Sequence, residues 1–129
     1  MRTEIDGITS KIIGTAIWVH QSLGPGLLES AYESVMEWQL QRRGLFVERQ
    51  KSVDLVVEDF RVPHAYTVDL LVNGLVVVEL KSVETLAPIH AKQVLTYLRL
   101  LDLHAGLLIN FGEETLTKGL RRLVNGPPR

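Results

Sequence analysis

The 129-residue sequence contains no cysteine, and this absence excludes several classes of protein at once. Disulfide scaffolds, thiolate zinc centres, iron–sulfur clusters and cysteine nucleophiles all need that side chain. No apolar run approaches the length of about 20 residues that a membrane helix needs, and residues 1–6 contain no signal-peptide core. We therefore expect a cytoplasmic protein that is neither secreted nor inserted in a membrane.

The sequence also lacks an excess of charge of either sign. Its Lys and Arg residues number 14 and its Asp and Glu residues 15, which gives a formal net charge of -1. No global positive field attracts nucleic acid, so a site for a polyanion has to be a local patch. Hydrophobic residues make up 46% of the chain, as in an ordinary globular protein. The length fits a single domain over residues 1–129, with the last few residues frayed.

Apolar spacing predicts two helices in the first third of the chain. One apolar stripe starts at Ile5 and recurs every three or four residues as far as Val19, and Gly24-Pro25-Gly26 ends that helix. A second helix is expected from about Leu27 to Arg43, with Glu33 among the residues that lie away from its buried face. The residues expected on that buried face are Leu28, Ala31, Tyr32, Val35 and Leu40.

After Gly44 the pattern changes to the alternation that is typical of strands. Pro88 suits the first position of a later helix over 88–101, and a short amphipathic helix is expected close to the C-terminus. This order predicts one α/β domain with a mixed sheet of about four strands. The expected strands span residues 46–57, 65–72, 75–83 and 104–111.

Two carboxylates and a lysine stand out on the central pair of strands. Alternation places Asp69 on one face of its strand and Glu79 with Lys81 on one face of the next. Aliphatic side chains fill the other face, so we expect the charged residues together on the solvent-facing side of the sheet. Paired carboxylates suit Mg²⁺ or Mn²⁺, and a nearby lysine can orient or deprotonate a metal-bound water. The alternative is a cross-strand charge pair, where each contact contributes about 0.2–1 kcal/mol.

The turn of this hairpin decides whether the charged cluster can form. A two-residue turn would send Asp69 and Glu79 to opposite faces of the sheet. We therefore predict a three-residue loop over residues 72–74, which pairs Leu71 with Leu75.

A glutamine and a tyrosine mark the helix that follows the hairpin. Gln93 and Tyr97 are four residues apart, so both project from one helix face. Taken alone, they fit a half-buried surface pair as well as a functional pair.

Taken together and in order, these residues resemble the GxxExxY proteins, a branch of the PD-(D/E)XK nuclease superfamily. The segment from Gly26 to Tyr32 reads GLLESAY and fits the signature of that branch. Asp69 and, ten residues later, Glu79-Leu80-Lys81 match the acidic residue and the ExK element, although Val68 stands where the motif has proline. The segment from Gln93 to Tyr97 resembles the QxxxY element of exonuclease-like members.

The resemblance covers about residues 8–112 and implies a restriction-endonuclease-like core. It implies a magnesium- or manganese-dependent nuclease that hydrolyses phosphodiester bonds of nucleic acid, with DNA favoured over RNA. The residues that it assigns to catalysis are Glu29, Asp69, Glu79, Lys81, Gln93 and Tyr97.

The resemblance also implies a role for each of these residues. Asp69, Glu79 and the backbone carbonyl of Leu80 hold the metal, and Glu29 reaches it directly or through water. Lys81 positions or deprotonates the attacking water. The Gln and Tyr of the QxxxY element bind the scissile phosphate or hold the lysine and the glutamate in place.

Other functions stay open at this point. A nucleic-acid-binding or protein-interaction module could keep the fold without turnover, and a small-molecule phosphodiesterase fits the same residues. The low net charge favours a homodimer or a partner protein as a further requirement. A cationic run near the C-terminus, Lys118, Arg121 and Arg122, is usually a solvated face, with a contact to nucleic-acid backbone as the alternative.

Overall fold

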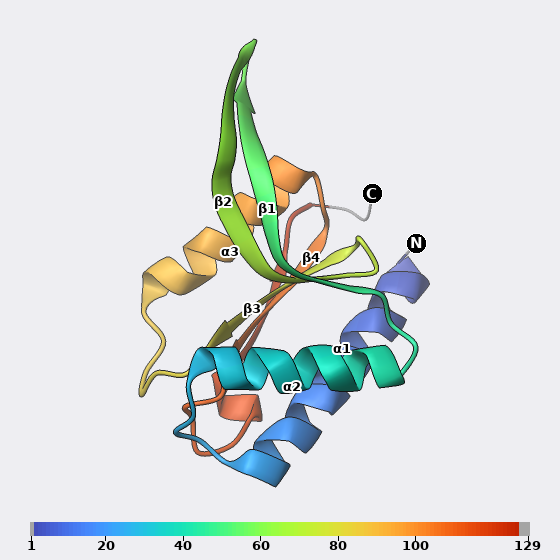
Figure 1. Ribbon diagram of the computed structural model, residues 1–129, viewed down its shortest axis with the longest axis vertical. Coiled ribbons are helices and arrows are strands. Elements are labelled where there is room, and N and C mark those ends of the chain that lie inside the picture. Colours follow the sequence, from blue (N-terminus) through green and yellow to red (C-terminus); the bar gives the residue numbers. More distant parts are fainter. Residues whose placement is uncertain (1, 127–129) are drawn as a thin grey trace.

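Three helices and one five-stranded sheet make up the chain, described over residues 2–126, with side chains from residue 4, in a computed structural model (Figure 1). The helices are α1 (Arg2–Leu23), α2 (Glu29–Arg42) and α3 (Pro88–Leu101). The strands are β1 (Val47–Val57), β2 (Phe60–Val72), β3 (Val76–Lys81), β4 (Ala105–Asn110) and β5 (Leu120–Val124), with a short 3-10 turn, η1 (Thr117–Gly119), before β5. None of these helices is long and apolar enough to cross a membrane. The end of the chain, where we predict fraying, lies outside the described residues.

The strands lie in the order β1-β2-β3-β4-β5. The first three are antiparallel neighbours, β3 and β4 are parallel, and β5 returns antiparallel to β4. Parallel neighbours need a crossover connection, and α3 provides it here. The predicted α/β domain with a mixed sheet is confirmed, with five strands in place of about four.

The predicted C-terminal helix is wrong, because that segment forms η1 and β5. Leu120 packs against the core on one face of the sheet and Leu123 against the core on the other. Residues three apart lie on opposite faces of a strand, whereas on a helix they share a face. β5 also pairs with β4, whose backbone groups along that edge would otherwise be unpaired.

Helices cover both faces of the sheet, in contrast to the expected single buried face. α1 and α2 pack on one face in the larger apolar core, and α3 packs on the other through Val94 and Leu98 (Figure 1). Leu71 and Val77, on the charged face of the hairpin, are buried beneath α3. The charged residues are therefore not on an open solvent face, because the crossover helix lies over that side of the sheet.

The hairpin of β1 and β2 extends beyond the rest of the sheet as a projecting arm (Figure 1). We define the arm as residues 54–64. β2 begins at Phe60 and includes Pro63, so it starts five residues before the expected 65. No arm residue belongs to either apolar core. The arm is thus stabilised by its own strand pairing and by the Asp54–Arg61 ion pair.

Candidate active site

The register of the β2–β3 hairpin brings the two carboxylates together. Val72 pairs with Val76, so the loop has three residues, as predicted, but it spans 73–75 instead of 72–74. Asn73 and Gly74 are both left-handed, with φ of 53° and 66°, and asparagine and glycine tolerate that conformation best. Leu71 therefore pairs with Val77, not with Leu75.

Asp69 and Glu79 lie where β2 and β3 separate. The regular pairs end at Leu70 and Val78, and continuing that register sets Asp69 opposite Glu79. The Asp69 carboxylate accepts the Leu80 N–H at 2.9 Å, and the Asp69 N–H donates to Glu79 Oε1 at 3.4 Å. At this point the side-chain carboxylates of Asp69 and Glu79 accept the backbone N–H groups that strand carbonyls accept in the regular part of the β2–β3 pairing.

An irregularity at the same point breaks the alternation of β2. We expect Val68 and Leu70 on one face, but Val68 belongs to the core under α3 and Leu70 to the core under α1 and α2. Gln50, which lies opposite Asp69 on β1, has a positive φ of 51°, and the regular pairing skips both residues. Before Leu70, β2 has no regular partner in β3 and pairs only with β1, with which it forms the arm.

Burial controls the charge of Glu79. Its side chain is only 7% exposed. Burial raises the pKa of Glu79 to about 9, and the adjacent Asp69 carboxylate adds to the shift through its hydrogen bond and its negative charge. The charge of Lys81 acts in the opposite direction on this pKa but is the weaker influence. Glu79 is therefore protonated and uncharged at neutral pH.

This pKa shift predicts a pH-dependent stability. A carboxyl group whose pKa rises from 4.5 to about 9 on folding favours the folded state fully below about pH 4.5, and that contribution is lost as the pH rises toward 9. Glu79→Gln keeps the shape without the charge, so in EDTA it should be the more stable protein by about 3 kcal/mol at pH 7. The difference should shrink toward pH 5 and grow toward pH 9.

Urea unfolding of both proteins across this pH range measures the difference directly. The exposed Glu29→Gln substitution removes a formal charge from the same chain and serves as the control. A difference between Glu79→Gln and the wild type that does not change with pH would contradict a protonated, buried Glu79.

Lys81 ends β3 beside the carboxylate pair. It is half-buried and makes no ion pair with any described residue. Its carbonyl accepts the Phe111 N–H at 2.8 Å on the β4 side. Since successive carbonyls of a strand point to opposite edges, the Leu80 carbonyl points to the edge where Leu80 donates to Asp69.

α3 borders the carboxylates through one of its two predicted residues. Tyr97 is half-buried and stacks on Tyr66 with ring centroids 4.7 Å apart. Burial, together with the charges of Glu79 and Asp69, raises the pKa of the Tyr97 hydroxyl. Gln93 is exposed one turn earlier, and its side chain forms no hydrogen bond with the described part of the chain.

Glu29 lies apart from the carboxylate pair. It is the exposed first residue of α2 and lines a hollow of about 530 Å³ together with Ser82, the residue that follows Lys81. Within residues 4–126 no hydrogen bond or ion pair joins Glu29 to Asp69 or Glu79. The described residues also contain no group of three or more acidic or histidine side chains that could hold a metal ion.

Tyr32 and Ser82 fix the loop in front of Glu29. The Tyr32 hydroxyl donates to the Gly24 carbonyl and accepts the Leu27 N–H at 3.2 Å, and its ring stacks on Phe111 at 4.4 Å. Ser82 Oγ donates to the Leu27 carbonyl at 2.6 Å. Tyr32 is thus a buried structural residue that fixes the loop over residues 24–27, and Ser82 ties this loop to the segment that follows β3.

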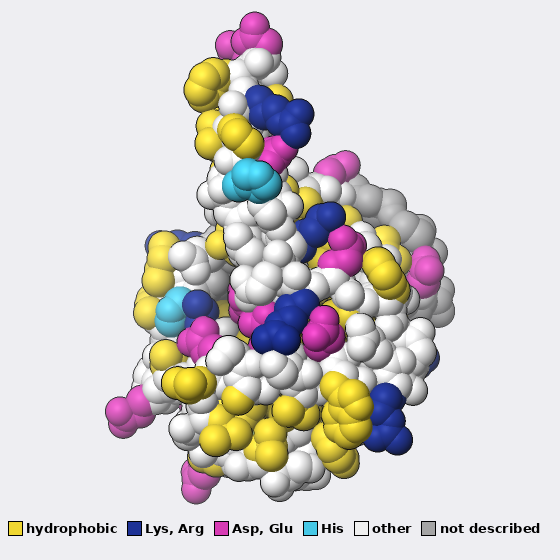
Figure 2. Space-filling view, in the orientation of Figure 1, with side chains coloured by type: hydrophobic (Ala, Val, Ile, Leu, Met, Phe, Trp, Pro, Cys, Tyr) yellow, Lys and Arg dark blue, Asp and Glu magenta, His cyan; other side chains and the backbone are white. Residues whose placement is uncertain are grey.

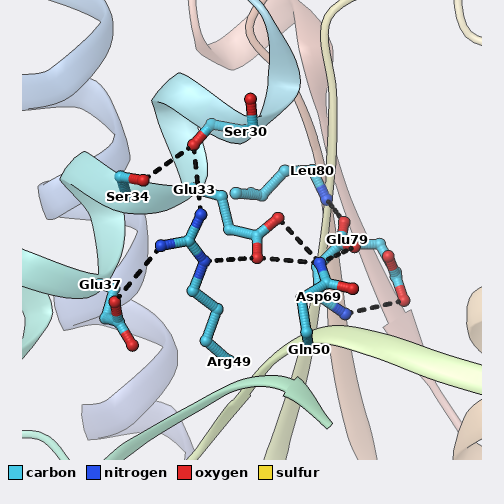
Figure 3. Close-up of polar contacts among 9 residues, drawn as sticks. All are labelled: Ser30, Glu33, Ser34, Glu37, Arg49, Gln50, Asp69, Glu79 and Leu80. Carbon is cyan, nitrogen blue, oxygen red and sulfur yellow. Dashed lines mark hydrogen bonds and ion pairs between the residues drawn. The ribbon is translucent and has the colours of Figure 1, made fainter. Parts of the chain in front are cut away.

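The acidic residue of α2 that reaches the site is Glu33, which the sequence patterns placed away from the buried face. Glu33 is 5% exposed. Its carboxylate accepts Arg49 Nε at 2.8 Å and Gln50 Nε2 at 2.9 and 3.0 Å, and Gln50 Nε2 also lies 3.3 Å from Asp69 Oδ1 (Figure 3). Gln50 therefore bridges the helix carboxylate and the strand carboxylate.

The buried face of α2 is rotated from the predicted one. Leu28, expected in the core, is 77% exposed, whereas Met36 is fully buried. The helix begins at Glu29, so Leu28 is its N-cap residue and lies outside the helical stripe. One signal in the sequence could have identified Glu33. It directly follows Tyr32, so a helix that buries Tyr32 against the sheet also brings Glu33 close to the sheet.

The donor set suits a hard divalent cation that keeps most of its waters. Two carboxylates and one backbone carbonyl are oxygen ligands of the kind that Mg²⁺ and Mn²⁺ accept. The raised pKa of Glu79 beside the Asp69 carboxylate marks a place where a positive charge would compensate two carboxylates. Asp69, Glu79 and the Leu80 carbonyl therefore fit such an ion. The described residues contain no group of three or more acidic or histidine side chains that could coordinate a metal without water.

An α/β domain with a carboxylate pair and a lysine where two central strands part has the architecture of a restriction-endonuclease-like protein. The family model of the PD-(D/E)XK nuclease superfamily matches residues 6–123, and the chain belongs to this superfamily. A search of curated proteins found no match.

Proposed function

We propose that the protein is a metal-dependent nuclease of the GxxExxY type that hydrolyses phosphodiester bonds of nucleic acid, with DNA favoured over RNA. The observation that carries this proposal is the buried Glu79 carboxyl beside the half-buried Asp69 carboxylate, with Lys81 next to them. A buried carboxyl group beside a carboxylate is costly to the fold, and perturbed carboxyl groups of this kind gather at functional sites.

Asp69, Glu79 and the Leu80 carbonyl would hold Mg²⁺ or Mn²⁺, and Glu29 would approach from α2, directly or through water. When bound, the ion supplies Lewis acidity and lowers the pKa of a coordinated water. Glu33 holds Gln50 against Asp69 and so orients that carboxylate before any ligand arrives. An orientation set in advance lowers the reorganisation needed in the transition state.

Lys81 would act on the attacking water and on the charge of the phosphorane-like transition state. It has no carboxylate partner among the described residues, so its three donor hydrogens stay available. Gln93, exposed on α3, would bind the scissile phosphate. Tyr97, whose ring is held by Tyr66, would hold Glu79 and Lys81 in place.

A catalytically silent binding module is the alternative. Such a module needs surface contacts, and it gains nothing from a buried glutamate whose pKa lies near 9. Cleavage therefore accounts for the buried Glu79 beside Asp69 better than binding alone does.

Incubation with labelled single- and double-stranded DNA and RNA, with magnesium, manganese or EDTA, tests the proposal. We expect cleavage with either metal and none in EDTA. Equal cleavage in EDTA would refute the metal mechanism. Binding without cleavage of any substrate would favour the silent module.

A further inference from the structure

The tip of the arm exposes apolar and acidic side chains together. Val56, Val57 and Phe60 are 60%, 55% and 67% exposed. Glu58 and Asp59 form the turn between them and make no ion pair with another described residue. Figure 2 shows apolar side chains along the projecting arm and acidic side chains at its end. An isolated two-stranded hairpin is marginally stable in water, and clustered exposed apolar groups mark interaction surfaces.

A hollow at the other edge of the sheet has the complementary character. It encloses about 260 Å³ between the start of α3 and β5. Apolar side chains, among them Leu86, Pro88 and Leu123, line it together with two arginines. Arg122 is paired with Asp6 at 2.9 Å, whereas Arg121 bonds only the Lys118 and Leu120 carbonyls within the described chain.

We propose that the arm tip of one copy of the chain docks into this hollow of a second copy. Phe60 and its cross-strand partner Val57, which share one face of the arm, would enter the apolar hollow, and Asp59 would face Arg121. The tip cannot reach the hollow of its own chain. The arm extends β1 and β2 at one edge of the sheet, whereas the hollow lies beside β5 at the opposite edge. In a closed two-fold dimer the contact forms twice.

The charge of the tip argues for a protein partner. Glu58 and Asp59 repel the phosphate backbone of nucleic acid, while Arg61 is neutralised by Asp54. An acidic apolar tip and a basic apolar hollow attract each other and also select the register of docking. The contact is independent of the proposed nuclease activity, since neither surface includes a residue of the carboxylate site.

A charge exchange tests the contact on the full chain by sedimentation velocity over a range of concentrations. Asp59→Arg and Arg121→Glu should each weaken the wild-type dimer at least tenfold. The double variant, which restores opposite charges at the contact, should recover most of the affinity. Leu100→Glu places a charge at an exposed apolar residue of α3 outside both surfaces and should change little.

Mixing two defective chains gives a second test. Phe60→Ser removes the apolar anchor but leaves the hollow intact, and Arg121→Glu leaves the tip intact. An equimolar mixture should therefore form a heterodimer with one contact, although each variant alone is monomeric and folded by circular dichroism.

Three outcomes would overturn the proposal. They are a wild-type chain that stays monomeric at every concentration, a double variant no better than its parents, and an Arg121→Glu variant that loses only oligonucleotide binding. Nuclease activity is measured in a separate assay, so a negative result for the dimer does not contradict the proposed nuclease function, and the reverse also holds.

Discussion

Lys81→Ala should reduce the rate of metal-dependent cleavage by about 10²–10³-fold while the protein stays folded. Lys81 is half-buried and has no ion-pair partner among the described residues, so its removal strands no buried opposite charge. We expect the free energy of unfolding to change by less than about 1 kcal/mol. The measurements are single-turnover cleavage and urea unfolding of the same preparation.

Two further variants sharpen this test. Lys81→Arg keeps the positive charge on a group that does not give up its proton, so activity in this variant would assign Lys81 to charge stabilisation and inactivity to proton transfer or shape. Lys11→Ala removes an exposed lysine from α1 and should leave the rate unchanged. If Lys81→Ala is largely unfolded, but the fraction that folds still cleaves at the normal rate, then Lys81 is a structural residue.

Magnesium affinity should rise about tenfold for each pH unit between about pH 6.5 and 8.5. An ion held by Asp69 and Glu79 would have to displace the proton of Glu79, because the pKa of Glu79 is about 9 in the free protein. Over this range about one proton should leave for each ion bound. Titration calorimetry in two buffers with different heats of ionisation measures both the affinity and the proton count.

Substitutions at the pair separate metal binding from other effects of pH. Glu79→Gln and Asp69→Asn should each abolish magnesium binding, while Gln93→Ala should keep it. Affinity that does not vary with pH in the wild type would show that the ion binds elsewhere. If magnesium binds tightly only in the presence of a phosphate ligand, its affinity should show the same dependence on pH when that ligand is present.

The network around Glu33 links the proposed catalytic carboxylates to the base of the arm. Arg49 and Gln50 both belong to β1, and both bond Glu33 of α2 (Figure 3). Gln50 then contacts Asp69 on β2. One buried carboxylate therefore holds together the three elements that meet at the site.

Local patterns in the sequence were sufficient to predict most helices and strands and the number of residues in the loop of the β2–β3 hairpin. The 3.6-residue stripe from Ile5 to Val19 lies in α1, and alternation identified the central strands. The requirement that Asp69 and Glu79 share a face excluded a two-residue turn, and the observed loop has three residues. These features depend on neighbours in the chain, so a short segment contains the information.

Tertiary structure alone decided the properties on which the proposed chemistry depends. Glu79 has a raised pKa because folding buries it and sets it beside Asp69, ten residues earlier in the chain. Glu33, and not Glu29, is linked to Asp69 through Gln50, because α2 begins after Leu28 and turns Tyr32 and Glu33 inward. The C-terminal leucines form a strand because β4 offers an unpaired edge. Burial and pairing of this kind arise from contacts between distant segments, which the periodicity of a single segment does not record.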